Sequence, residues 1–188
     1  MKYLILILTL ACSHVVTTPD PIKKPVQVSI PEIPDSSPKP YLTVTSCTNC
    51  TPDQWMFIQN ANKKLNEVVS SQCFKDEVLK FQFLQGWTLG RNNQEILDSL
   101  LGADVKIETE IYYTWKRVLG YTLDGSMKEW LNSRYLVTFG VNELASLLCH
   151  ESSHKLNYSH QFNYVSGRER TIPYALNQII ETCTKGIP

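Results

Sequence analysis

The sequence lacks an excess of charge of either sign, and it lacks an apolar run long enough to cross a membrane. Its 188 residues carry 18 basic and 18 acidic side chains. With no basic patch interleaved with aromatic residues, this balance gives no electrostatic reason to expect nucleic acid as a partner. The apolar run at the N-terminus is shorter than the about 20 residues of a bilayer-spanning helix. No repeat or separate substrate domain is visible, so we expect one folded domain and a monomer.

The first 40 residues predict export and a tether. Residues 1–12, MKYLILILTLAC, have a lysine and then an apolar run, as in a secretory signal peptide. Ala11-Cys12 resembles a bacterial lipobox, which predicts that Cys12 is lipidated; the alternative is that Cys12 is removed with the signal. Residues 13–40 hold seven of the ten prolines and predict an extended tether, in which His14 has no role. We expect an exported protein, secreted or in the cell envelope, whose one membrane contact is this anchor.

Residues 41–188 predict a single α+β domain. Residues 41–46 and 104–114 alternate between apolar and polar side chains, which is typical of strands. Residues 116–122 and 127–136 predict two further strands that flank an Asp-Gly turn.

The same region predicts several helices. Residues 51–70 form an expected packing helix, with Thr51 as its N-cap and a proline next to it. Residues 92–101 predict a short helix. The pattern of residues 73–84 is ambiguous and fits a short helix that enters a strand. Residues 171–183 predict a final helix.

Three of the four histidines lie in the stretch LCHESSHKLNYSH, residues 148–160. His150, Glu151 and His154 form the pattern H-E-x-x-H, and His160 follows. At about 100° per residue, His150 and His154 share one helix face, from which both imidazoles can reach one metal ion. The residues of the opposite face are apolar or small, which predicts packing on a core: Val141, Leu144, Ala145, Leu148, Cys149, Ser152 and Leu156.

Two imidazoles beside a carboxylate are typical of a zinc site. Zn²⁺ binds neutral imidazole at about 2.0–2.1 Å and, in catalytic sites, keeps three protein ligands and a water. A carboxylate off the metal can take the proton of that water as it attacks a carbonyl, and Glu151 stands in the position for it. The alternative is a metal-free helix with two solvated histidines, because H-E-x-x-H also occurs by chance.

The segment HESSHKLNYSH is similar to the extended H-E-x-x-H-x-x-G-x-x-H motif of the metzincin-like zincin metallopeptidases. Asn157 stands where that motif has a glycine in the left-handed conformation, which asparagine also tolerates. Together with Thr171-Ile172-Pro173-Tyr174-Ala175, the motif resembles small bacterial secreted or lipoprotein-type proteins of predicted metalloprotease character. The chain departs from the metzincins in having no methionine after Met127, and therefore no Met-turn.

The resemblance implies a small zincin-like domain, with a twisted sheet of about three to five strands packed on a packing helix and an active-site helix, plus a C-terminal helix. It implies that a strand of residues 116–136 lies at the sheet edge and pairs with the substrate backbone. An ordinary edge hairpin is the open alternative.

The resemblance also implies the chemistry of the site. Zn²⁺ would be held by His150, His154 and His160, and Glu151 would be the general base. Tyr174 would help to bind the reaction intermediate. The substrate would be a peptide or protein, and the sequence leaves its identity open.

Five cysteines remain after Cys12, and an odd number leaves at least one thiol unpaired. Cys149 is expected to be free, because it lies on the back of the metal helix, away from His150. The other four allow three disulfide pairings, among which the sequence does not choose: Cys47, Cys50, Cys73 and Cys183. A lone C-x-x-C is weak support for zinc, and export favours disulfides.

Three hypotheses remain. The first is a zinc-dependent peptidase tethered outside the cytoplasm, and the second is a zincin-like envelope binding module without turnover. The third is a metal-free helical domain. Arg168 and Arg170 are expected to be solvated loop residues, with the rim of a substrate cleft as the alternative.

Overall fold

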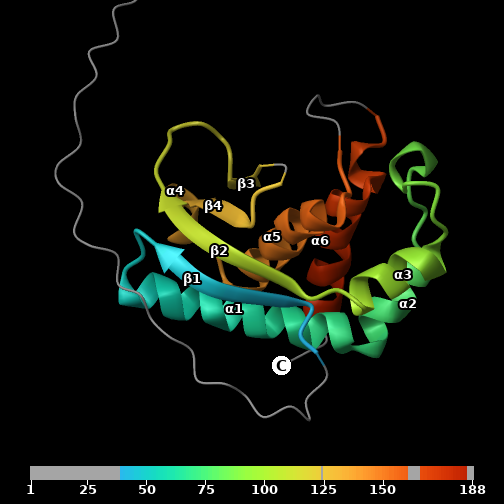
Figure 1. Cartoon of the computed structure of the whole chain (residues 1–188), viewed down its shortest axis with the longest axis horizontal. Helices are drawn as coiled ribbons and strands as arrows, with labels where there is room; N and C mark the ends of the chain where they lie inside the picture. The colour runs from blue at the N-terminus through green and yellow to red at the C-terminus, as the bar shows by residue number, and fades with distance from the viewer. Residues whose placement is uncertain (1–38, 124, 161–165, 186–188) are drawn as a thin grey trace, which may run out of the picture.

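The computed structural model describes residues 39–123, 125–160 and 166–185, in which the chain forms six α-helices and a four-stranded mixed sheet (Figure 1). The predicted α+β class is confirmed. The predicted signal peptide, Cys12, His14 and nearly all of the tether lie outside the described residues. Within the described part, no helix has the length and apolar character needed to cross a bilayer.

The sheet has the strand order β1-β2-β4-β3. Its strands are β1 (Leu42–Thr48), β2 (Val105–Tyr112), β3 (Gly120–Thr122) and β4 (Lys128–Asn132). The pairs β1–β2 and β2–β4 are parallel, and β3 pairs antiparallel with β4, so β3 is an antiparallel edge strand. Along β2, buried Val105, Ile107 and Thr109 alternate with exposed side chains, so the helices cover one face of the sheet.

Helix α1 (Pro52–Ser70) is the predicted packing helix. Thr51 and Gln54 form a capping box that satisfies free N–H groups at its start. Its apolar stripe is buried, and the Asn66 side chain hydrogen-bonds both the N–H and the C=O of Leu42, which docks α1 on β1. In Figure 1, α1 runs along β1, and α5 and α6 lie together beyond it.

The remaining helices are α2 (Gln72–Lys80), α3 (Asn93–Leu101), α4 (Ser133–Leu136), α5 (Val141–Ser153) and α6 (Ile172–Thr184). Helices α3, α5 and α6 agree with the sequence-based expectations. Residues 73–84 contain a helix but no strand. The side-chain nitrogen of Asn93 lies within hydrogen-bond distance of the carbonyl oxygens of residues 78, 79 and 81, so its two N–H groups hold the chain that leaves α2.

The predicted strands over 116–122 and 127–136 are too long. Only Gly120–Thr122 and Lys128–Asn132 pair, and the chain then turns into α4. The reason is buried Asn132, whose side chain accepts from the N–H of Arg134 and donates to the carbonyls of Thr114 and Val118. These bonds cap α4 and draw the chain before β3 into a loop.

Two disulfides join the four cysteines whose pairing the sequence leaves open. Cys73–Cys183 connects α2 to α6, and Cys47–Cys50 joins the end of β1 to the loop that follows it. Cys149 is free and fully buried, as predicted.

We predict that replacing Cys73 and Cys183 by alanine lowers the free energy of unfolding by about 2–5 kcal/mol. In the chain-entropy account, the gain from a disulfide grows with the loop that it closes, and this one spans a sequence separation of 110. The matched control, Cys47 and Cys50 to alanine, opens a separation of 3 and should lower stability less. Chemical denaturation measures both, and an equal or larger loss in the control would contradict this ranking.

Candidate metal centre

The helix that carries the motif stops where the sequence predicts. Helix α5 is followed by the 3₁₀ turn η2 (His154–Leu156), and Asn157 then adopts a left-handed conformation with φ 65°. The Tyr158 N–H donates to the Ser153 carbonyl, which closes the helix end in a Schellman arrangement. Because the chain reverses here, His160 returns toward the face of α5 from which it has just departed.

The three histidines converge. The Nε2 atoms of His150 and His160 are 3.2 Å apart, and one nitrogen from each of the three rings lies within 4.8 Å of the others. Two nitrogens at about 2.05 Å from one tetrahedral ion are separated by about 3.3–3.4 Å. The cluster therefore has the dimensions of a three-imidazole site that can hold a metal ion.

Backbone carbonyl groups hold the imidazole rings of His150 and His154 in position. His154 Nδ1 lies 2.7 Å from the Tyr158 carbonyl oxygen, and the His150 ring donates a hydrogen bond to the carbonyl of Pro173. Tyr158 is itself buried, and its hydroxyl accepts a hydrogen bond from Arg91 at 2.8 Å. Carbonyl acceptors of this kind set the tautomer and orientation of metal-binding histidines.

His150 is held in its neutral form. Burial is the main cause that lowers its pKa to about 3, and the neighbouring His154, His160 and Arg168 lower it further. A neutral imidazole has a free lone pair for a metal at physiological pH, so protons compete weakly for this ligand.

Glu151 lies beside the histidines, and only 5% of its surface is exposed. Burial raises its pKa to about 7, whereas Lys155 and a hydrogen bond from the backbone of Thr122 lower it. Lys155 also donates to the Thr122 hydroxyl and to the Ser126 carbonyl. These hydrogen bonds connect the turn η2 to the β3–β4 hairpin. Thr122 therefore fixes the orientation of Glu151 from the edge strand.

A second buried carboxyl group, Glu129 of β4, lies within electrostatic range of Glu151. Burial, followed by the charge of Glu151, raises its pKa well above the usual range. Neither of its oxygens has a hydrogen-bond partner among the described residues. A protonated Glu129 limits the repulsion that two buried carboxylates would otherwise have.

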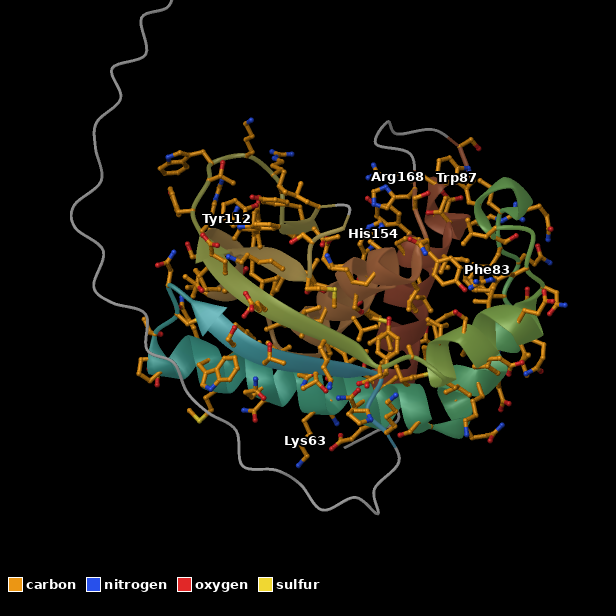
Figure 2. The ribbon with its side chains drawn as sticks, viewed as in Figure 1. Lys63, Phe83, Trp87, Tyr112, His154 and Arg168 are labelled. Carbon is orange, nitrogen blue, oxygen red and sulfur yellow. A yellow bond between two sulfur atoms is a disulfide. The ribbon has the colours of Figure 1, made fainter. Side chains whose placement is uncertain are left out.

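Tyr174, near the start of α6, completes the cluster. Its ring centre is 4.7 Å from that of His150 and 4.8 Å from that of His160. The Arg168 guanidinium stacks over the same ring at 4.5 Å and donates a hydrogen bond to its hydroxyl. Figure 2 shows His154 and Arg168 near one another, between the β3 hairpin and α6.

These residues line a cleft of about 700 Å³ that β3 borders on one side and α6 on the other. Apolar Val118, Leu119 and Leu147 contribute to its wall, and so does β3 through residues 120–122. An extended chain in this cleft would meet the edge strand and the histidine cluster together.

The structure brings together all five residues that the sequence singles out for this site. They are His150, His154, His160, Glu151 and Tyr174. No local sequence pattern marks Thr122 or Arg91, whose contacts depend on the folded chain. Arg168 is half-buried and lines the cleft, in agreement with the rim alternative, whereas Arg170 is exposed.

Comparisons with protein-family models, with curated proteins and with solved structures found no match for this chain.

We predict that the purified protein holds about one zinc ion per chain after dialysis and that His154→Ala weakens zinc binding by more than about 100-fold. Losing an outer hydrogen bond alone weakens a metal site by about 10–100-fold, and loss of a ligand should exceed that. Metal analysis and competition with a chelator measure both quantities. The matched control is His14→Ala, which removes the one histidine outside the cluster. Equal weakening by both variants would contradict the site.

Proposed function

We propose that this protein is a zinc-dependent metallopeptidase of the metzincin-like zincin kind. The observation that carries the proposal is the convergence of three imidazole nitrogens beside a buried carboxylate, at the wall of a cleft. Imidazole ligands suit zinc, copper, iron and nickel. The adjacent carboxylate within H-E-x-x-H favours hydrolytic zinc chemistry among these.

The chain's own residues have distinct tasks in this proposal. Zinc, when bound to His150, His154 and His160, supplies Lewis acidity that acidifies a water molecule and polarises a carbonyl. Glu151 takes the proton of the attacking water and passes it to the leaving amine. Thr122 holds the Glu151 carboxylate in position through its backbone N–H.

Tyr174 has its ring against two of the histidines, so its hydroxyl can donate a hydrogen bond to the carbonyl oxygen as negative charge develops there. The arginine that donates to this hydroxyl, Arg168, makes the phenol a stronger donor. This supports the tyrosine role that the family resemblance implies.

The edge strand β3 supports the proposed way of binding the substrate. It is short, it pairs antiparallel with β4, and its residues line the cleft. An extended peptide can add to such an edge through main-chain hydrogen bonds while its side chains enter neighbouring pockets. Our proposal that the domain is zincin-like is based on this edge strand and on helix α5.

The proposed location is outside the cytoplasm. Disulfides persist in oxidising compartments, and the described chain contains two. A signal peptide over residues 1–12, with lipidation of Cys12 and a Pro-rich tether over 13–40, would place the domain in the cell envelope or in the medium.

We predict that Glu151→Gln lowers kcat by at least about 100-fold, since general-base catalysis contributes about 10²–10⁴-fold. Zinc content should stay at the wild-type level, because glutamine keeps the shape and Glu151 is not a metal ligand. A quenched-fluorescence peptide library, read with and without chelator, supplies the assay. Glu143→Gln is the matched control, since Glu143 is an exposed carboxylate on the same helix. Full zinc binding without hydrolysis by the wild type would favour the alternative, a non-catalytic envelope binding module.

The pH dependence follows from Glu151. The base must be ionised, so kcat/KM is expected to fall as the pH falls through its pKa, which burial raises to about 7. A bound dication favours the carboxylate, so the midpoint of this acid limb should lie below 7 in the zinc form. Zinc content measured at each pH separates loss of the base from loss of metal. A rate that rises between pH 7 and pH 5 at constant zinc content would rule out this role.

A further inference from the structure

Arg168 occupies a fixed place in the cleft wall. It follows Gly167, whose φ of 88° starts the tight turn η3 (Arg168–Arg170). The carbonyl of Arg168 accepts hydrogen bonds from both the N–H and the hydroxyl of buried Thr171. Its guanidinium carbon lies over the Tyr174 ring, 4.5 Å from the ring centre. The backbone and the head group are therefore both oriented before any ligand arrives, which reduces the entropy lost on binding.

Arg168 lies within a short distance of the histidine cluster. Its guanidinium carbon is 4.5 Å from the Tyr174 ring centre, which is 4.7 Å from the His150 ring centre. The sum of these two distances is shorter than the length of three extended residues, each of which spans about 3.3–3.6 Å. A peptide whose scissile carbonyl lies at the histidines therefore has a group within about three residues that can reach this guanidinium.

The charges that line the cleft favour an anion. Apart from the histidines, the charged side chains among the described lining residues are Arg168 on the α6 side, Arg117 on the β3 side, and Glu151. A zinc ion on the histidines would add further positive charge. A guanidinium presents five N–H donors in a planar fork that matches the two oxygens of a carboxylate, and Arg168 donates one of them to the Tyr174 hydroxyl.

We infer that Arg168, assisted by Arg117, binds a carboxylate of the substrate within about three residues of the bond that is cut. The inference rests on the proposed peptidase function and narrows its substrate class. The carboxylate has two possible sources, the free C-terminus of the peptide or an acidic side chain. The first source makes the protein a peptidase that releases short C-terminal fragments, and the second makes it a peptidase selective for acidic sequences.

The test measures binding rather than turnover. Zinc-loaded Glu151→Gln protein is titrated with acetylated five-residue peptides of alanine and leucine, with either a free carboxyl terminus or an amide. A second pair, both with amide ends, carries one glutamate or one glutamine. We expect one of the carboxylate peptides to bind at least about tenfold more tightly than its neutral partner. A charge-assisted hydrogen bond contributes a free energy of this size. The pair that shows this ratio identifies the source.

Substitutions of Arg168 distinguish binding of the substrate carboxylate from the hydrogen bond that Arg168 donates to Tyr174. In the Glu151→Gln background, Arg168→Gln should reduce the ratio to about one and leave the affinity for the neutral peptide unchanged, and Arg168→Lys should retain part of it. The matched control is Arg170→Gln, because Arg170 is exposed and donates to the Gln82 carbonyl outside the cleft. Its ratio should equal that of the parent protein.

Two outcomes would overturn the inference. One is equal affinity for carboxylate and neutral peptides in both pairs, and the other is a loss in Arg168→Gln that is the same for all peptides. Hydrolysis by the wild-type protein is followed in parallel. A carboxylate preference without any hydrolysis would contradict the proposed function and leave only the carboxylate-binding role of Arg168 standing, whereas hydrolysis without the preference would contradict this inference alone.

Discussion

The candidate site depends on one backbone constraint, the reversal of the chain directly after the motif helix. Asn157 adopts the left-handed conformation, and the Tyr158 N–H closes the helix on the Ser153 carbonyl. Without this stop, α5 would continue and carry His160 away from His150. The same turn sets the carbonyl of Tyr158 against His154. Chain direction and ligand orientation are thus fixed by the same few residues, and burial of the Tyr158 side chain anchors them to the core.

The region around this turn contains buried carboxyl groups that reduce the stability of the fold. Glu129 and Glu151 are both buried, and burial raises the pKa of each. The Glu129 carboxyl has no hydrogen-bond partner within the part of the chain that the structure describes, and such a group destabilises the folded state by an amount on the order of 1–3 kcal/mol. Local conflicts of this kind concentrate at functional sites. The Cys73–Cys183 disulfide and the apolar face of α5 stabilise the fold that holds them.

Sequence patterns predicted the parts that depend on local chemistry. The H-E-x-x-H spacing predicts that His150 and His154 share one face, Asn157 fits the end of the helix, and Thr51 fits an N-cap, all in agreement with the structure. Contacts between distant segments left no local signal. The sequence did not indicate which cysteines pair, that Asn132 ends β4, or that Thr122 would reach Glu151. For Arg168 it offered two readings, because only the packing of α6 against α5 decides whether that loop faces the cleft.

The zinc coordination sphere is the most direct test of the account. X-ray absorption at the zinc edge, together with the anomalous signal from crystals of the zinc-loaded protein, identifies the ligands and their distances. We predict one zinc ion bound by the imidazoles of His150, His154 and His160 at about 2.0–2.1 Å, with the Glu151 carboxylate not bound to the metal. Zinc held by other side chains, or an ordered protein with the three rings turned apart and no ion between them, would contradict it.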